Sequence, residues 1–138
     1  MIPAMVLDMG DLPKISVGVD LVSIRRIEKM FYRWGERFLR RVYSDDEIDY
    51  CLTRARPASS LAARFAAKEA FFKAVSRRGE GLVGHRGIEV VVGSDGIPGI
   101  RSYGEAARAL GDRTVSLSIS HDEDLAIAVV VTSSEDIS

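Results

Sequence analysis

The chain has little cysteine and little histidine, and it has no long apolar run; each scarcity excludes a class of protein. Cys51 is the single cysteine among 138 residues, so an intrachain disulfide is impossible and we expect a reducing compartment. Neither of the two histidines stands in a local motif with Cys51, which argues against a cysteine nucleophile. No run approaches the roughly 18–20 apolar residues of a membrane span, and the start lacks the pattern of a secretory signal. We therefore expect a cytoplasmic protein without a membrane partner.

Charge of one sign is not in excess either. The 19 Lys and Arg residues against 20 Asp and Glu residues give a net charge of −1, so the composition does not favour nucleic acid or an anionic membrane as a partner. Basic residues nevertheless cluster over 25–41, and acidic residues follow over 45–49. The plain interpretation is a solvated helix face; the alternative is a docking face for an acidic partner.

The hydrophobic pattern predicts one α+β domain. The first half indicates a strand over 15–22 that ends near Asp20, followed by helices, and the second half returns to strand-like alternation. The expected helices cover 24–34 (with a further turn or two over 36–42), 45–53, 58–77 and 103–110, and the other expected strands cover 88–92, 97–101, 114–120 and 125–132. The order β-α-α-α-β-β-α-β-β predicts an antiparallel sheet with the helices packed on one side. Residues 15–132 would form the domain, with a flexible N-terminal arm over 1–14 and a polar tail over 133–138.

Two carboxylates carry most of the chemical interest. Asp20 is the only charge in its apolar strand, where it needs a partner unless it caps the following helix. Glu69 lies one helical turn before Lys73, with aromatic residues near the same face; a helix ion pair worth about 0.3–0.5 kcal/mol is the plain interpretation. Together Asp20 and Glu69 offer hard oxygen ligands for Mg²⁺, and Lys68 and Lys73 offer positive charge for a phosphate group.

Four segments of the sequence resemble one family, the holo-acyl-carrier-protein synthases. The family's first motif is similar to residues 18–22 (Gly-Val-Asp-Leu-Val), and its second motif is similar, almost letter for letter, to residues 65–74 (Phe-Ala-Ala-Lys-Glu-Ala-Phe-Phe-Lys-Ala). The family's hairpin resembles residues 95–98, and its C-terminal segment resembles residues 118–121, which an apolar strand follows. The segments stand in the family's order and spacing over most of the chain.

The resemblance implies an activity and a set of partners. Enzymes of this family transfer the 4′-phosphopantetheine group of coenzyme A to a serine of apo acyl carrier protein for fatty acid biosynthesis, release adenosine 3′,5′-bisphosphate and need Mg²⁺. Small members are homotrimers with active sites at subunit interfaces. Carried over residue by residue, the resemblance implies that Asp20 and Glu69 are metal ligands and that these two and Lys73 are catalytic. It implies that Lys68, Lys73 and His121 line the coenzyme A pocket. The residues that it implies for docking the acidic carrier are Arg26, Met30, Phe38 and Arg41.

Some questions stay open at this level. The general base is Glu69, a metal-bound hydroxide, or Glu47 acting through a water, although Ser44 and Glu47 also match a helix capping box. A transferase or hydrolase acting on another nucleotide diphosphate is one rival function, and a non-enzymatic module that binds acidic helices is another.

Further features bear on assembly and on the pocket. Two adjacent strands carry more apolar surface than a small core needs, which favours a subunit interface, and the resemblance implies that the assembly is a trimer. The apolar residues are Leu117, Ile119, Leu125, Ile127, Val129 and Val131. The chain departs from the family pattern at Phe72, where a smaller or polar residue is common, in the charged segment 77–81 and in the N-terminal arm.

Overall fold

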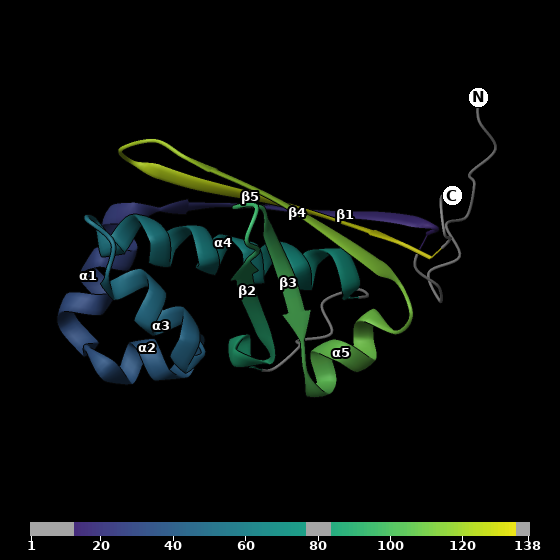
Figure 1. The fold of residues 1–138 in the computed structure, drawn as a ribbon, viewed down its shortest axis with the longest axis horizontal. Coiled ribbons are helices and arrows are strands. Elements are labelled where there is room, and N and C mark those ends of the chain that lie inside the picture. The colour runs from purple at the N-terminus through teal and green to yellow at the C-terminus, as the bar shows by residue number, and fades with distance from the viewer. Residues whose placement is uncertain (1–12, 77–83, 135–138) are drawn as a thin grey trace, which may run out of the picture.

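The computed structural model describes residues 13–76 and 84–134 (Figure 1). The predicted arm, apart from residues 13 and 14, the charged segment 77–81 and most of the predicted tail lie outside the described residues. The elements are β1 (Ile15–Ser23), α1 (Ile24–Trp34), α2 (Glu36–Val42), α3 (Asp45–Leu52), α4 (Pro57–Val75), a 3₁₀ turn η1 (His85–Gly87), β2 (Ile88–Val92), β3 (Pro98–Ser102), α5 (Gly104–Leu110), β4 (Thr114–His121) and β5 (Leu125–Ser133).

The described strands form two antiparallel sheets. β5 lies between β1 and β4 in a three-stranded sheet, and β2 pairs with β3 in a separate hairpin. Helix α4 runs along one side of the larger sheet, while α1, α2 and α3 gather at one end of the molecule (Figure 1). The predicted α+β class with antiparallel pairing is confirmed; the division of the strands between two sheets was not predicted.

Local sequence signals account for most element boundaries. The Ser23 side chain accepts a hydrogen bond from the Arg26 backbone nitrogen at 3.2 Å and begins α1. Gly35, at a φ of 54°, separates α1 from α2. The predicted end of the first strand near Asp20 was wrong, because β1 stays paired with β5 as far as Ser23. Helix α4 ends two residues earlier than predicted, because Ser76 has extended backbone angles.

Helix α4 forms the centre of the core and lies directly against β1. Its many alanines let the strand approach closely, and the Ser16 hydroxyl donates to the Ala74 carbonyl oxygen at 2.6 Å. Gly18 stands where any Cβ atom would overlap the backbone oxygen of Ala70. The strand therefore needs glycine at this position for close packing, and this contact fixes Asp20 on β1 relative to Glu69 and Lys73 on α4. No helix within the described ranges is long and apolar enough to cross a membrane.

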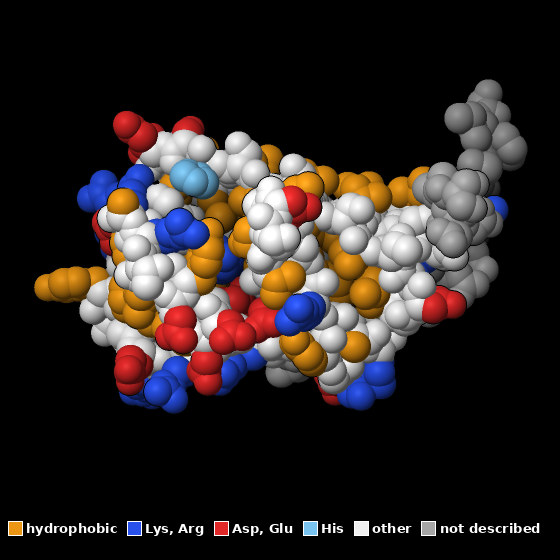
Figure 2. Space-filling view, viewed as in Figure 1, with side chains coloured by type: hydrophobic (Ala, Val, Ile, Leu, Met, Phe, Trp, Pro, Cys, Tyr) orange, Lys and Arg blue, Asp and Glu red, His pale blue; other side chains and the backbone are white. Residues whose placement is uncertain are grey.

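The two faces of the larger sheet differ in exposure. Alternate residues of β1 and β5 pack on α4, whereas Ile15, Val17, Val19 and Leu21 on the opposite face are 50–59% exposed. Hydrophobic side chains are visible along the edge of the molecule where this sheet lies (Figure 2). The prediction that β4 adds Leu117 and Ile119 to the surplus apolar surface was wrong, because both side chains pack against the core.

Candidate functional site

Asp20 and Glu69 line the same groove, although 48 residues of sequence separate them. The groove has a volume of about 560 Å³ and lies between β1, α1 and α4, and its lining also includes Arg26, Met30 and Phe65. Residues Phe65 and Glu69 are four positions apart on α4, so both project toward the groove from one face of the helix. The structure thus brings the two carboxylates to one groove, and their role as metal ligands stays a prediction.

Lys73 holds Asp20 from across the β1–α4 contact. Its Nζ atom lies 3.0 Å from Asp20 Oδ1 and 3.0 Å from the Val19 carbonyl oxygen. The Lys73 side chain is 55% exposed, whereas Asp20 is 16% exposed. Asp20 therefore has the charged partner that its place in an apolar strand requires, and Lys73 keeps enough exposure to meet a ligand.

Glu69 has a partner that sequence reasoning missed. His85 Nε2 lies 2.9 Å from Glu69 Oε1, and the two side chains are each about one third exposed. The His85 ring stacks on Phe65 and meets Phe72 edge-on, with ring centroids 5.4 Å and 5.3 Å apart. His85 begins the η1 turn ahead of β2, and no spacing in the sequence signals its contact with Glu69.

Lys68 lies in the interior, away from the predicted phosphate contact. Its ammonium is fully buried and donates to Glu47 Oε1 at 2.7 Å, to the His85 carbonyl oxygen at 3.0 Å and to the Ile88 carbonyl oxygen. Burial lowers the pKa of Lys68, while Glu47 opposes that shift. With three acceptors for its three protons, Lys68 joins α3, α4 and β2 and presents no free donor to a ligand.

Glu47 is a structural residue in this arrangement. It completes the capping box with Ser44, and its second carboxylate oxygen accepts a hydrogen bond from the Val90 backbone nitrogen at 3.1 Å. The side chain is buried, so a role as general base through a water is not supported. The capping-box interpretation is confirmed.

His121, the other predicted pocket residue, ends β4 and is exposed. Its Nδ1 atom lies 3.4 Å from the Asp122 carbonyl oxygen, and it pairs with Ala126 in the sheet register. It does not line the groove that contains Asp20 and Glu69. The structure of the single chain therefore leaves the prediction for His121 untested.

The predicted docking residues lie on two adjoining grooves. Met30, Phe38 and Arg41 line a groove of about 290 Å³ together with Trp34 and Arg37, while Arg26 lies with Met30 on the rim of the first groove. Phe38 is largely buried and packs edge-on against Tyr43. Met30 lines both grooves, so a partner bound over the second would reach the first.

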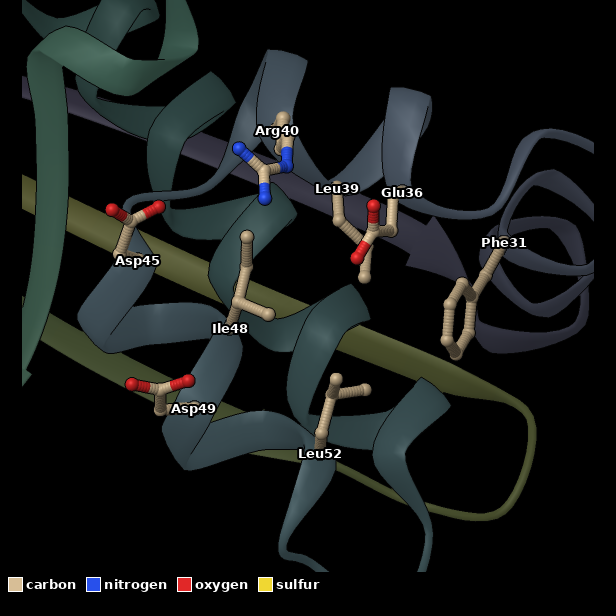
Figure 3. Close-up of a pocket in the computed structure, with 8 residues that line it drawn as sticks. All are labelled: Phe31, Glu36, Leu39, Arg40, Asp45, Ile48, Asp49 and Leu52. Atoms are coloured by element: carbon tan, nitrogen blue, oxygen red, sulfur yellow. The ribbon is translucent and has the colours of Figure 1, made fainter.

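A third groove, between α1, α2 and α3, has the opposite charge (Figure 3). Leu39 and Ile48 are among its apolar residues, and three carboxylates, those of Glu36, Asp45 and Asp49, line it beside one guanidinium, that of Arg40 (Figure 3). Acidic side chains gather in the surface view at the end of the molecule where α3 lies, with basic side chains beside them (Figure 2). None of the predicted site residues lines this groove, and its acidity is unsuited to an acidic carrier or a phosphate ligand.

The first groove offers carboxylates to a hard cation and Arg26 to an anion, and its one hydroxyl, that of Ser23, caps α1. No cluster of three or more His, Cys, Asp or Glu side chains suited to a metal occurs among the described residues. Asp20 and Glu69 are the two carboxylates that line the first groove, and Mg²⁺ is an ion that proteins usually bind through one or two carboxylates, with waters and phosphate oxygens completing its coordination. Cys51 is fully buried, and burial raises its pKa to about 11, which excludes it as a nucleophile.

The family model, the sequence relatives and the solved structures that match this chain all indicate the same family. A family model described as the 4′-phosphopantetheinyl transferase superfamily matches residues 16–130. A holo-[acyl-carrier-protein] synthase of Carboxydothermus hydrogenoformans is 43% identical over 119 residues, which cover 84% of this chain and 95% of that protein. The coenzyme A complex of the Chronobacterium ammoniagenes ACPS superposes with a TM-score of 0.77 at 35% identity, covering 90% of this chain and all of that one. The Helicobacter pylori holo-[acyl-carrier-protein] synthase, also in complex with coenzyme A, gives a TM-score of 0.72 at 37% identity and covers 85% and 99% of the two chains.

Proposed function

The chain belongs to the 4′-phosphopantetheinyl transferase superfamily, and from this premise we propose that it is a Mg²⁺-dependent holo-[acyl-carrier-protein] synthase. It transfers the 4′-phosphopantetheine group of coenzyme A to a serine of apo acyl carrier protein and releases adenosine 3′,5′-bisphosphate. The observation that carries the proposal is the groove in which Asp20 and Glu69 face a common space beside the arginine-bearing helices. The named relatives, two of them bound to coenzyme A, support the same substrate.

The groove residues fit Mg²⁺ as the cofactor. Asp20 and Glu69 supply two carboxylates from rigid elements, one from a strand and one from a helix. When bound, the ion neutralises charge on the diphosphate and orients the phosphorus that is attacked. Lys73, which already compensates the charge of Asp20 and is partly exposed, contributes a further positive charge near the leaving group.

The carrier protein brings the nucleophile, which explains why the chain needs none. Arg37 and Arg41 border the docking groove, and Met30 and Phe38 supply its apolar part. An acidic helix bound in the docking groove gains complementary charge. Because Met30 lines both the docking groove and the first groove, the serine of the bound carrier would lie close to the first groove. Of the candidate bases, Glu47 is buried within its capping box, so Glu69 is the side chain among them that faces the groove.

We also propose that copies of the chain assemble as a homotrimer through the outer face of the larger sheet. The exposed apolar side chains of β1 continue onto Leu125 and Ile127 of β5, which are 40% and 38% exposed. An apolar sheet face of this extent is typical of an interface. A ring of subunits would cover it and bring a neighbour's residues, His121 among them, toward each groove. The single reduced cysteine suits work in the cytoplasm.

Mass spectrometry of an apo carrier protein tests the activity directly. We expect the carrier to gain one phosphopantetheine when it is incubated with coenzyme A, Mg²⁺ and this protein, and to stay unmodified when Mg²⁺ is chelated. Consumption of coenzyme A or another nucleotide without carrier would instead support an enzyme acting on a different acceptor. Binding of the carrier without any modification would support a docking module.

A further inference from the structure

His85 is the one ring in contact with a carboxylate of the groove among the described residues, and neither the motifs nor the proposed reaction gives it a role. It lies in the η1 turn, 16 residues beyond Glu69 in the sequence. Three separate contacts fix its position: a hydrogen bond from its ring, packing on two aromatic rings, and a bond to its backbone. So many constraints on a partly exposed side chain need an explanation.

We propose that His85 is a positioning residue that orients the carboxylate of Glu69 for the metal ion. This inference rests on the proposed function, because it concerns the same site. His85 does not touch substrate; it acts through Glu69, by donating a hydrogen bond to one carboxylate oxygen and thereby directing the other toward the groove.

The direction of the hydrogen bond follows from the chemistry of its two partners. An ionised carboxylate can only accept hydrogen bonds, so Nε2 of His85 carries the hydrogen and Oε1 of Glu69 accepts it. The distance of 2.9 Å is ordinary for a hydrogen bond between nitrogen and oxygen. Oε1 is thereby restrained, and the remaining lone pairs of Glu69 are left for a ligand. Metal-binding carboxylates commonly receive such a second bond, and its loss typically weakens metal binding about 10–100-fold.

Aromatic packing keeps the imidazole ring in place. Phe65 stacks on the ring at an interplanar angle of 18°, and Phe72 contacts it edge-on at 83°. Residues 65, 69 and 72 share one face of α4, so the helix presents the carboxylate and both aromatic walls to the same imidazole. The contact with His85 gives the unusual Phe72 a structural role.

Lys68 fixes the backbone from which His85 projects. Its buried ammonium donates to the carbonyl oxygens of both His85 and Ile88, at either end of the η1 turn, and to Glu47. Lys68 directly precedes Glu69 in α4, so the turn is anchored to the same helix that carries the metal ligand. Asp20 is held in a comparable way by Lys73, and each carboxylate of the groove therefore has its own donor.

Two substitutions separate the hydrogen bond from the ring. His85→Phe keeps an aromatic ring against Phe65 and removes the donor, whereas His85→Gln keeps a side-chain N–H and removes the ring. Mn²⁺ serves as the probe, and its binding is measured by electron paramagnetic resonance, which does not depend on turnover. We expect the dissociation constant for Mn²⁺ to rise about 10–100-fold in His85→Phe and to return toward the wild-type value in His85→Gln.

Transfer kinetics supply a second readout. In His85→Phe the Mg²⁺ concentration for half-maximal rate should rise, while kcat at saturating Mg²⁺ stays close to wild type. The proposal is overturned if His85→Phe binds Mn²⁺ as tightly as the wild-type protein, or if His85→Gln binds it as weakly as His85→Phe. It is also overturned if the wild-type protein does not bind Mn²⁺. If His85→Phe fails to fold, His85→Met provides an apolar side chain without a donor. A wild-type protein that binds Mn²⁺ but modifies no carrier would refute the proposed function and leave the Mn²⁺ comparison valid.

Discussion

Replacing Gly18 by alanine should damage both the fold and the site, because β1 touches α4 through backbone atoms at this point. A Cβ atom on residue 18 would overlap the Ala70 carbonyl oxygen and lie 2.8 Å from the Ala74 backbone nitrogen. Ordinary contact begins at 3.4 Å, so the nitrogen alone requires a shift of about 0.6 Å, and the carbonyl oxygen requires more. Backbone atoms of a core helix cannot move aside as a flexible side chain can.

The expected loss of stability is about 2–3 kcal/mol, in the upper part of the range for overpacked cores. The same displacement moves Asp20 away from its partner Lys73, now 3.0 Å distant, and away from Glu69 on the same helix. A misplacement of about 1 Å can reduce an enzymatic rate about 100-fold. We therefore expect Gly18→Ala to lose transfer activity by one to two orders of magnitude in the fraction that remains folded.

Urea unfolding followed by transfer kinetics at saturating coenzyme A tests both parts, with Gly99→Ala as the matched control. Residue 99 also lies in a strand, but an added Cβ atom would meet only a Val91 methyl group at 3.8 Å. Alanine suits a strand better than glycine, so the control should be unchanged or up to about 1 kcal/mol more stable. If Gly18→Ala matches Gly99→Ala in stability and rate, the close approach of β1 and α4 is not required.

Other substitutions test the remaining assignments. Asp20→Asn and Glu69→Gln should each lower the transfer rate by two or more orders of magnitude with little change in unfolding free energy; near-normal turnover at limiting Mg²⁺ removes that residue from the metal site. Arg41→Glu should raise the KM for carrier much more than the KM for coenzyme A. Arg40→Glu is the control, because Arg40 lies on the same helix but lines the acidic groove, and it should leave the KM for carrier unchanged. If the two substitutions raise the KM for carrier equally, the carrier does not bind in the docking groove. Lys68→Met removes the nearer of two cations beside the buried Glu47 carboxylate, because Lys68 lies 2.7 Å from it and Arg64 lies 4.0 Å from it. The substitution should lower the unfolding free energy by about 3–5 kcal/mol; a small loss, measured in urea, contradicts its interior role.

The sequence predicted those parts of the fold that local chemistry determines. Ser23, Gly35 and the Ser44–Glu47 capping box mark helix ends through interactions within a few residues. The partition of strands into two sheets depends instead on contacts between distant segments. Leu117 and Ile119 show the same limit: alternation separated them from the β4 serines but could not say which set faces α4.

In the site, too, local periodicity could be predicted from the sequence and contacts between distant segments could not. The two lysines of α4 illustrate the first case. At about 100° per residue, Lys73 returns to nearly the same face as Glu69, whereas Lys68 and Lys73 are about 140° apart around the helix. Periodicity alone thus permits only one of them to face the groove with Glu69, and the structure turns Lys68 inward to Glu47. All three protons of Lys68 are bound in the interior, so none is left for a phosphate group. His85 is different, because no helical period relates it to Glu69; Lys68 holds it in place by binding the carbonyl oxygens of His85 and Ile88. Lys68, which the resemblance placed in the coenzyme A pocket, is thus a buried residue that binds the backbone of His85, whose ring contacts the Glu69 carboxylate.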